Sequence, residues 1–390
     1  MVASLMNTGC QAPLKRPDRI RGIWVTRMDY KTESDIVQIM ENCKSLGLNT
    51  VIFQIRGNGT VFYPSKIEPW AEQFNFTDPS FDPLKVAIRE AHKRGLLLEA
   101  YVNVMPAWRG PDEPANRKQL YHTHPEWFWY DKDGKRQPLV HQVGDRRQGW
   151  YVSLNPCLPE VREYLVEVFH EIVSRYDVDA LHLDYIRFPN ERVVPGEKIP
   201  DYPRDARTLA LYKADTGLAP DDNPERWMEW RADQVTRLVR DIHAMVKRTR
   251  PRAVVTAAVG ANPERSKKAH FRDSRRWAQE GLLDVAYPMN YTADPEEFRK
   301  GIENWADAPP DVAVAQGIGV WRLNTREALL GHVRAAEDAA GHFCLFAYSS
   351  FFETADDPPE GPSEERTRLR AMRVAALREH LASKTVRPAD

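Results

Sequence analysis

Apolar residues recur along this chain in eight short runs, and segments with helical periodicity separate most of them. The runs cover residues 21–27, 50–56, 96–103, 180–187, 253–260, 283–291, 312–319 and 342–351. Each run ends in polar or aromatic residues, as strands do where they reach the rim of a sheet. Eight such strands alternating with helices predict an α/β fold, a (β/α)8 TIM barrel.

Amphipathic segments between the runs predict the helices of this barrel. They cover residues 33–46, 83–94, 159–176, 230–249 and 325–339. Pro159 followed by Glu160, and Thr325 followed by Glu327, are suitable helix openings, because proline needs no N–H partner there and acids suit the positive end.

Two long inserts interrupt the alternation, and both follow the C-terminal end of a strand. The first spans residues 104–155, after strand three, and the second runs from 189 to about 227, after strand four. Inserts on this rim of a barrel commonly build its site. Their many aromatic residues either offer a stacking surface for a flat ligand or pack the loops onto the barrel.

The chain length of 390 residues allows one large barrel or two to three ordinary domains. No internal repeat or linker stands out, so we expect a single barrel over residues 21–384. Residues 1–20 and 385–390 are expected to be tails, and residues 364–383 a last helix.

Charge and cysteine content narrow the possible partners. With 55 basic and 56 acidic residues, the chain has no large net field that would favour nucleic acid or an anionic membrane. The four cysteines are far apart and predict neither a zinc site nor a disulfide framework, and no cofactor is expected. No segment approaches the roughly 18 apolar residues of a membrane span. The oligomeric state is left open.

Residues 5–10 end like a lipoprotein cleavage site, with small residues before a cysteine, but lack a basic start and a proper apolar run. We therefore expect no complete targeting signal in this stretch.

The fourth run changes abruptly from apolar to ionisable residues. The two-residue period of a strand places Leu181 and Leu183 on one face and His182 and Asp184 on the other. A buried carboxylate is costly unless it is paired, so either Arg187 neutralises Asp184 or Asp184 takes part in chemistry.

The C-terminal ends of the runs are rich in amides, guanidinium groups and aromatic rings and contain few carboxylates. This mixture suits the hydroxyls and apolar faces of sugars better than a phosphate or a metal ion. The predicted substrate-binding residues are Arg27, Gln54, Arg56, Tyr101, Asn103, His182, Arg187, Asn290, Tyr291, Gln316, Trp321 and Tyr348.

Glycoside hydrolysis needs an acid for the leaving oxygen and commonly a second carboxylate. Asp184 is the best single candidate, and its partner is either Glu99, Glu353 or an acetamido group of the substrate itself. His182 is expected to orient Asp184 by a hydrogen bond. The residues thus favour a glycoside hydrolase. A carbohydrate-binding barrel without catalysis is the alternative, and an enzyme for a small polar metabolite, clamped by Arg27, Arg56 and Arg187, is a third possibility.

Several linked motifs over residues 21–352 resemble the bacterial glycosyl-hydrolase-like family 10 proteins. They are RGIWVTR at 21–27, NTVIFQIRGNG at 49–59, HPEW at 124–127 with 131–134, LNP at 154–156 leading into PEVR at 159–162, LDYIRFP at 183–189 and PMNY at 288–291. The resemblance implies a (β/α)8 fold, an acidic catalytic residue at Asp184, and N-acetylated cell-envelope glycans or related polysaccharides as substrates. It also favours an extracytoplasmic location.

The chain departs from this family pattern at two positions. Many relatives read His-Ala-Trp-x-Asn where this chain has Glu99-Ala100-Tyr101-Val102-Asn103, and many have glutamine where Met289 stands. The first change brings in a carboxylate and the second removes an amide from the expected groove.

Overall fold

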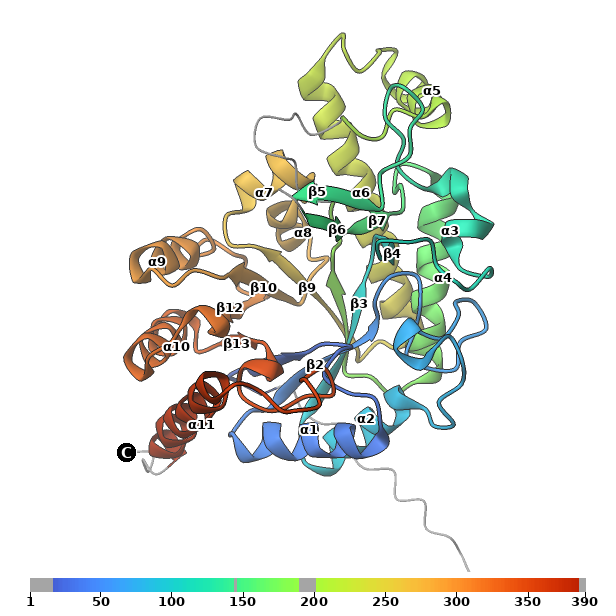
Figure 1. The fold of residues 1–390 in the computed structure, drawn as a ribbon. Coiled ribbons are helices and arrows are strands. Elements are labelled where there is room, and N and C mark those ends of the chain that lie inside the picture. Colours follow the sequence, from blue (N-terminus) through green and yellow to red (C-terminus); the bar gives the residue numbers. More distant parts are fainter. Residues whose placement is uncertain (1–16, 144–145, 189–200, 386–390) are drawn as a thin grey trace, which may run out of the picture.

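The computed structural model describes residues 17–143, 146–188 and 201–385 (Figure 1). The expected lipoprotein-like stretch at 5–10, most of the expected N-terminal tail and residues 386–390 lie outside these ranges. Within them, no helix combines the length and the apolar character that crossing a membrane requires.

Eight parallel strands form a closed barrel, because the last strand, β13, pairs with the first, β1. The predicted TIM barrel is therefore confirmed. Its strands are β1 (Arg21–Val25), β2 (Thr50–Arg56), β3 (Leu97–Asn103), β8 (Ala180–Asp184), β9 (Val254–Gly260), β10 (Val285–Asn290), the divided seventh strand β11 (Ala313–Val314) and β12 (Gln316–Gly319), and β13 (Phe343–Phe346).

The alternation predicted for the fourth run is confirmed. Leu181 and Leu183 belong to the apolar cluster that includes the helix faces, whereas His182 and Asp184 bond to residues of other barrel strands. A smaller cluster, with Trp24, Tyr101 and Tyr287 among its members, fills the barrel interior. A barrel core of this kind holds the strand ends at fixed positions around one mouth.

Helices surround the barrel (Figure 1). They are α1 (Glu33–Ser45), α2 (Pro83–Lys93), α4 (Pro159–Arg175), α6 (Pro224–Thr249), α7 (Pro263–His270), α8 (Ser274–Gln279), α9 (Pro295–Glu303), α10 (Arg326–Ala340) and α11 (Glu364–Thr385). Thr325 accepts a hydrogen bond from the N–H of Ala328, as expected of a helix cap. Helix α6 begins six residues earlier than predicted, where Asn223 caps it and Pro224 takes its first position.

The first insert folds back over the rim of the barrel. Its strand β4 (Pro106–Arg109) pairs antiparallel with β7 (Tyr151–Ser153), which places Arg109 opposite Tyr151. The insert also contains α3 (Leu120–Thr123) and a second ribbon, β5 (Val140–Val143) with β6 (Arg146–Gly149). The second insert contributes α5 (Ala206–Thr216), and its residues 189–200 lie outside the described ranges.

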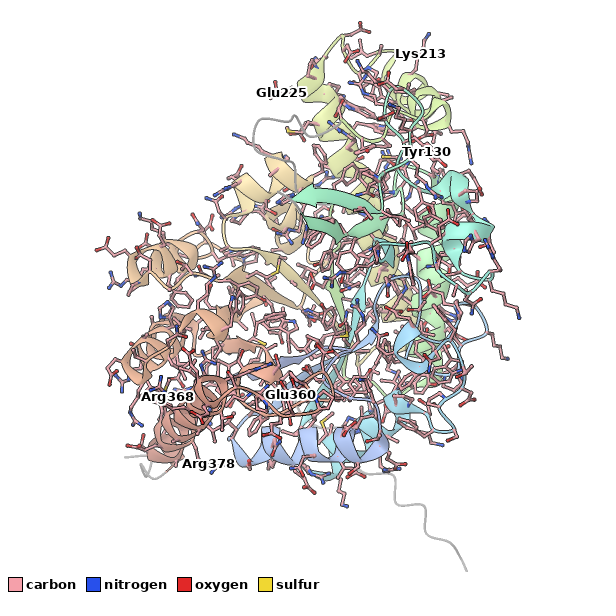
Figure 2. The ribbon with its side chains drawn as sticks, viewed as in Figure 1. Tyr130, Lys213, Glu225, Glu360, Arg368 and Arg378 are labelled. Carbon is pink, nitrogen blue, oxygen red and sulfur yellow. The ribbon has the colours of Figure 1, made fainter. Side chains whose placement is uncertain are left out.

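Most aromatic side chains of the inserts pack the loops down rather than forming a stacking surface. Trp129 is buried with its ring 4.1 Å from that of Phe188 at right angles, and its indole N–H donates to the carbonyl of Leu154. Phe128 and Tyr121 are buried beside it. Figure 2 shows Tyr130, the next residue in this insert, among the side chains in the upper part of the molecule. Of the two expectations for these aromatics, loop packing describes this group.

Candidate active site

A cavity of about 500 Å³ opens at the C-terminal ends of the barrel strands. It lies where barrel enzymes place their sites. It is lined by Thr26, Arg27, Met28, Gln54, Tyr101, Asn103, Arg109, Tyr151, Asp184, Tyr185, Arg187, His270, Arg272, Met289, Tyr291 and Phe346. The predicted residues Arg27, Gln54, Tyr101, Asn103, Asp184, Arg187 and Tyr291 are thus brought together here.

Asp184 ends strand β8 and is the only carboxylate among the described residues that line this cavity. The phenol of Tyr101 donates a 2.9 Å hydrogen bond to Oδ2, and the backbone N–H of Tyr185 donates a 2.6 Å bond to Oδ1. Tyr185 has φ +49°, in the left-handed region that a tyrosine seldom adopts. Such backbone outliers concentrate at functional sites, where the surrounding structure holds them in place.

Positive charge dominates the rest of the cavity. Arg27, Arg109, Arg187 and Arg272 all line it. Burial, together with the charges of Arg187, Arg272 and Arg265, lowers the pKa of His270 to about 3, so this imidazole is neutral near pH 7. Burial and Arg187 also lower the pKa of Arg272 to about 9, although Asp184 opposes the shift. The cavity therefore favours negative charge on whatever it binds.

Glu99 lies inside the barrel below this cavity. Its carboxylate accepts hydrogen bonds from Thr256 at 2.6 Å and from Tyr287 at 2.7 Å. In the β3–β8 register Glu99 is opposite Ala180, four residues before Asp184, which corresponds to about 13 Å along the strand. Glu99 does not line the cavity, so the structure does not place it as the carboxylate partner of Asp184.

The expectation that His182 orients Asp184 is wrong. His182 is fully buried; its Nε2 accepts from the indole of Trp24 at 3.1 Å, and its Nδ1 lies 2.9 Å from the hydroxyl of Thr256. Tyr101, one strand away, holds Asp184 instead. Because His182 does not line the cavity, its assignment to substrate binding is also corrected.

Arg56 is a structural residue rather than a substrate contact. It is fully buried, with Nε 2.7 Å from Oε2 and Nη2 2.6 Å from Oε1 of Glu68. Its remaining nitrogen donates to the carbonyls of Asn103, the last residue of β3, and of Val104, the next residue. With Arg56 paired away from the cavity, the predicted clamp of three arginines around a small metabolite is not formed.

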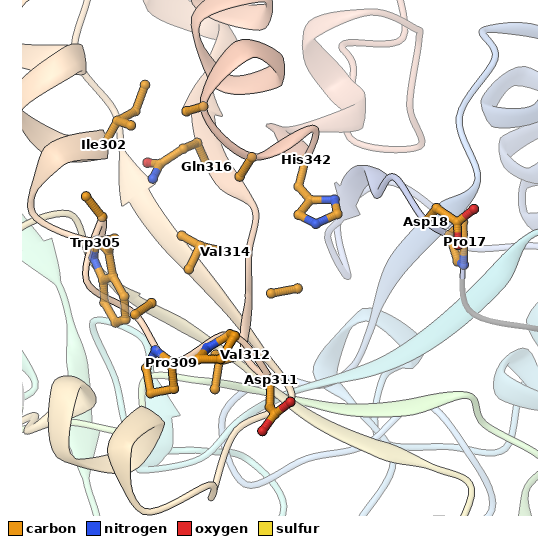
Figure 3. Close-up of a pocket in the computed structure, with 16 residues that line it drawn as sticks. Pro17, Asp18, Ile302, Trp305, Pro309, Asp311, Val312, Val314, Gln316 and His342 are labelled. Atoms are coloured by element: carbon orange, nitrogen blue, oxygen red, sulfur yellow. The ribbon is translucent and has the colours of Figure 1, made fainter. Parts of the chain in front are cut away.

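Asn290 and Gln316 face the outer helices instead of the groove. Asn290 donates a 2.8 Å hydrogen bond to the carbonyl of Phe298 in α9, and its amide lies 3.4 Å from Oε1 of Gln316. Gln316 borders a second cavity, of about 660 Å³, which also contacts Trp305 and His342 (Figure 3). Neither residue lines the cavity of Asp184, so both predictions are corrected.

The remaining predicted residues lie at or beyond the rim. Trp321 is 44% exposed and packs edge-on against Tyr291, with ring centroids 5.1 Å apart, so it extends the cavity wall outward. Tyr348 is buried outside the cavity and accepts a hydrogen bond from Asn42 of α1. Glu353 is an exposed residue after the strand β13 region and does not line the cavity.

Sequence reasoning missed several residues of this cavity. Arg109 and Tyr151 reach it because the first insert folds back. His270 reaches it from the last position of α7, and Arg272 from the short segment between α7 and α8. Tyr151 belongs to the aromatic group noted in the first insert, whereas His270 and Arg272 carried no signal. Met289, where many relatives have glutamine, does line the cavity. Within the described ranges, no three His, Cys, Asp or Glu residues gather into a metal-binding group.

The family model described as "Glycosyl hydrolase-like 10" matches residues 19–322 of this chain. Two curated relatives are the glycosyl hydrolase YngK of Bacillus subtilis, 27% identical over 303 residues, and the glycosyl hydrolase DigH of Escherichia coli, 27% identical over 312 residues. Each match covers 70% of this chain, but only 54% of YngK and 65% of DigH.

Solved structures give the same fold. The glycoside hydrolase domain of PgaB (BpsB) from Bordetella bronchiseptica is 15% identical, with a TM-score of 0.63 over 93% of this chain and 98% of that domain. The catalytic domain of a Paenibacillus polymyxa beta-amylase is 9% identical, with a TM-score of 0.61 over 94% and 98%. At these identities the likeness concerns the barrel alone. The family model, in contrast, matches most of the chain. This protein belongs to the glycosyl hydrolase-like 10 family.

Proposed function

We propose that this protein is a glycoside hydrolase that acts on a bacterial cell-envelope glycan or a related N-acetylated polysaccharide, with Asp184 as its catalytic carboxylate. The observation that carries the proposal is the position of Asp184 in a polar, aromatic cavity at the C-terminal rim of a barrel, where it is the one carboxylate that the described part of the chain contributes. Membership of a glycosyl hydrolase-like family supports the reaction class, and we propose that residues 21–384 act as one catalytic barrel.

The cavity offers the contacts that a sugar chain requires. Both side-chain polar atoms of Asn103 are buried without a hydrogen-bond partner among the residues that the structure describes, and they can bond a hydroxyl or an acetamido group. Tyr291 and the exposed Trp321 provide aromatic faces, and the guanidinium groups of Arg27 and Arg187 provide donors. Because Trp321 lies outside the cavity, we propose that a polymer extends past the mouth.

The test is the release of reducing ends from a panel of glycans: peptidoglycan strands with and without peptides, and poly-N-acetylglucosamine with different degrees of N-acetylation. We expect turnover of at least one glycan by the wild type, loss of turnover in Asp184→Asn, and retention in Glu353→Gln. Circular dichroism is the control that each variant is folded. Equal turnover by Asp184→Asn and the wild type would exclude the proposed role of Asp184.

A carbohydrate-binding barrel without catalysis is the second candidate, because only one carboxylate lines the described cavity. It predicts that calorimetry detects glycan binding while no glycan of the panel is cleaved. In that case Asp184→Asn would change affinity alone.

A further inference from the structure

Among the described residues, one carboxylate lines the cavity, whereas glycoside hydrolysis requires two chemical roles. One group must supply a proton to the leaving oxygen, and another must stabilise or attack the anomeric carbon. Among the described residues, Glu99 lies below the cavity and Glu353 beyond it. The second role therefore falls to a group of another type, either a side chain of the cavity or the acetamido group of the substrate.

The contacts of Asp184 suit the role of nucleophile. Both of its oxygens accept hydrogen bonds, Oδ2 from the phenol of Tyr101 and Oδ1 from the backbone N–H of Tyr185. These bonds hold the carboxylate at the end of β8 with both oxygens acting as acceptors, which places Asp184 to attack or stabilise the anomeric carbon.

Tyr151 of β7 is the phenol best placed to donate one. Its side chain is buried against the cavity, and its hydroxyl lies 3.5 Å from both Nη1 and Nη2 of Arg27. The guanidinium of Arg109 lies 5.2 Å from the centre of its ring. Within the described ranges no carboxylate lies at ion-pair distance from either arginine, although the charge of Glu72 acts on Arg27 from farther away, and both guanidinium groups act on this phenol.

Tyr151 and Asp184 line the same cavity and are linked through Tyr185. The ring centroid of Tyr151 is 5.0 Å from that of Tyr185, and the backbone N–H of Tyr185 donates to Asp184. The ionisable groups facing Tyr151 are Arg27 after β1, Arg109 of β4, Tyr101 of β3 and Tyr185 after β8. Tyr185 in turn interacts with Asp184 at the end of β8.

The electrostatics separate Tyr151 from the other phenols of the cavity. Burial alone would raise the pKa of Tyr151, but the charges of Arg27 and Arg109 outweigh it and hold this pKa below its ordinary value. The pKa values of Tyr101, Tyr185 and Tyr291 are all raised, chiefly by burial. A phenol with a lowered pKa is a stronger proton donor, and its phenolate is stabilised by two guanidinium groups.

We propose that Tyr151 is the general acid of this site, paired with Asp184 as the nucleophile. The inference rests on the proposed glycosidase function and deepens it.

In the first step the Tyr151 proton passes to the glycosidic oxygen as the bond from that oxygen to C1 breaks, and Asp184 forms a bond to C1. The leaving chain departs as an alcohol, and Tyr151 remains as a phenolate. In the second step water attacks C1, the phenolate takes the proton of that water, and the Asp184–C1 bond breaks. One water is consumed and both residues are restored.

Tyr151→Phe tests the proposal, with Tyr130→Phe as a matched control. Tyr130 (labelled in Figure 2) is in the same insert, but it does not line the cavity, and its hydroxyl donates to the carbonyl of Pro125. We expect Tyr151→Phe to lower kcat/KM for the glycan about 10²- to 10⁴-fold and to remove the alkaline limb of its pH profile. A 2,4-dinitrophenyl N-acetylglucosaminide of the preferred anomer needs no protonation to leave, so its cleavage by this variant persists. When azide is added, it attacks C1 in place of water in the second step, because it needs no deprotonation, and the product is a glycosyl azide.

Retention of full glycan turnover and of the alkaline limb in Tyr151→Phe would overturn the inference, as would an equal loss on glycan and dinitrophenyl substrate without azide rescue. If Tyr151→Phe does not fold, Arg109→Gln tests the inference in its place. Arg109 is exposed, so its substitution is expected to leave the fold intact. It is expected to move the alkaline limb upward by about half a pH unit to one unit, and an unmoved limb would overturn the inference. If the wild type cleaves neither substrate, the proposed function itself fails.

Discussion

Glu68→Gln is predicted to destabilise the barrel strongly although it changes the shape of the side chain very little. The side chains of Glu68 and Arg56 are both 0% exposed, and two short hydrogen bonds join them. The substitution removes the negative charge and leaves the guanidinium of Arg56 buried without a counterion. Breaking a buried pair in this way costs about 3–5 kcal/mol, which is roughly two to four powers of ten in the unfolding equilibrium.

The assay is urea denaturation followed by circular dichroism, comparing the wild type, Glu68→Gln, Arg56→Met and the double variant. Because the two residues share one interaction, the double variant is expected to lose less stability than the sum of the single variants, by about 2 kcal/mol or more. Some loss remains in the double variant, because Arg56 also donates to the carbonyls of Asn103 and Val104. A loss below about 1 kcal/mol in Glu68→Gln, or strictly additive losses, would refute the reasoning.

Three further predictions concern the rim. Burial raises the pKa of Asp29 to about 7, although the hydrogen bonds from Thr26 oppose this shift. The folded protein therefore loses stability as the pH rises from about 4 through 7, because the buried carboxyl group becomes charged. Asp29→Asn should therefore gain stability relative to the wild type, by up to roughly 4 kcal/mol at pH 8, and an equal difference at pH 5 and pH 8 in urea denaturation would contradict this. Tyr101→Phe removes a donor to Asp184 and should lower glycan kcat about 10- to 100-fold; steady-state kinetics with unchanged kcat would argue against that hydrogen bond in catalysis. Trp321→Ala should raise KM for long glycans more than for disaccharides, and an equal change for both would place the polymer elsewhere.

The barrel was predictable because its strands and helices follow simple periods. The strand β2 has the predicted bounds, and β3, β9 and β10 differ from them by one or two residues. The buried alternation at Leu181–Asp184 likewise followed from the two-residue period of a strand. The strand bounds and the alternation depend on the local pattern of apolar residues, so they can be predicted from a single sequence.

Several predicted site residues do not line the cavity, because their side chains point to another face of the barrel wall or lie too far below the mouth. Asn290 and Tyr291 are neighbours in one extended segment, so they point to opposite faces, and only Tyr291 reaches the cavity. Arg56 follows an irregularity in the β2–β3 register between Gln54 and Arg56, which no pattern of apolar residues reveals. Glu99 has the predicted inward direction but lies too deep.

The contribution of the first insert depends on tertiary folding. Arg109 and Tyr151 are 42 positions apart in the sequence and meet only because β4 and β7 pair across the rim. The aromatic content of the insert was visible in the sequence, but whether each ring packs inward or faces the cavity depends on that pairing. The sequence left Glu99, Glu353 or an acetamido group of the substrate as the partner of Asp184. We propose the phenol of Tyr151, which lies near two arginines, and this arrangement depends on the folding of the insert.

The central claim is that Asp184 carries out glycoside hydrolysis at the barrel mouth. The most direct measurement is the initial rate of reducing-end release from the preferred glycan by purified Asp184→Asn, relative to the wild type, with both proteins shown to be folded by circular dichroism. Loss of the catalytic carboxylate is predicted to lower this rate by about three powers of ten or more, equivalent to at least about 4 kcal/mol of transition-state stabilisation. A rate within tenfold of the wild type would contradict the account.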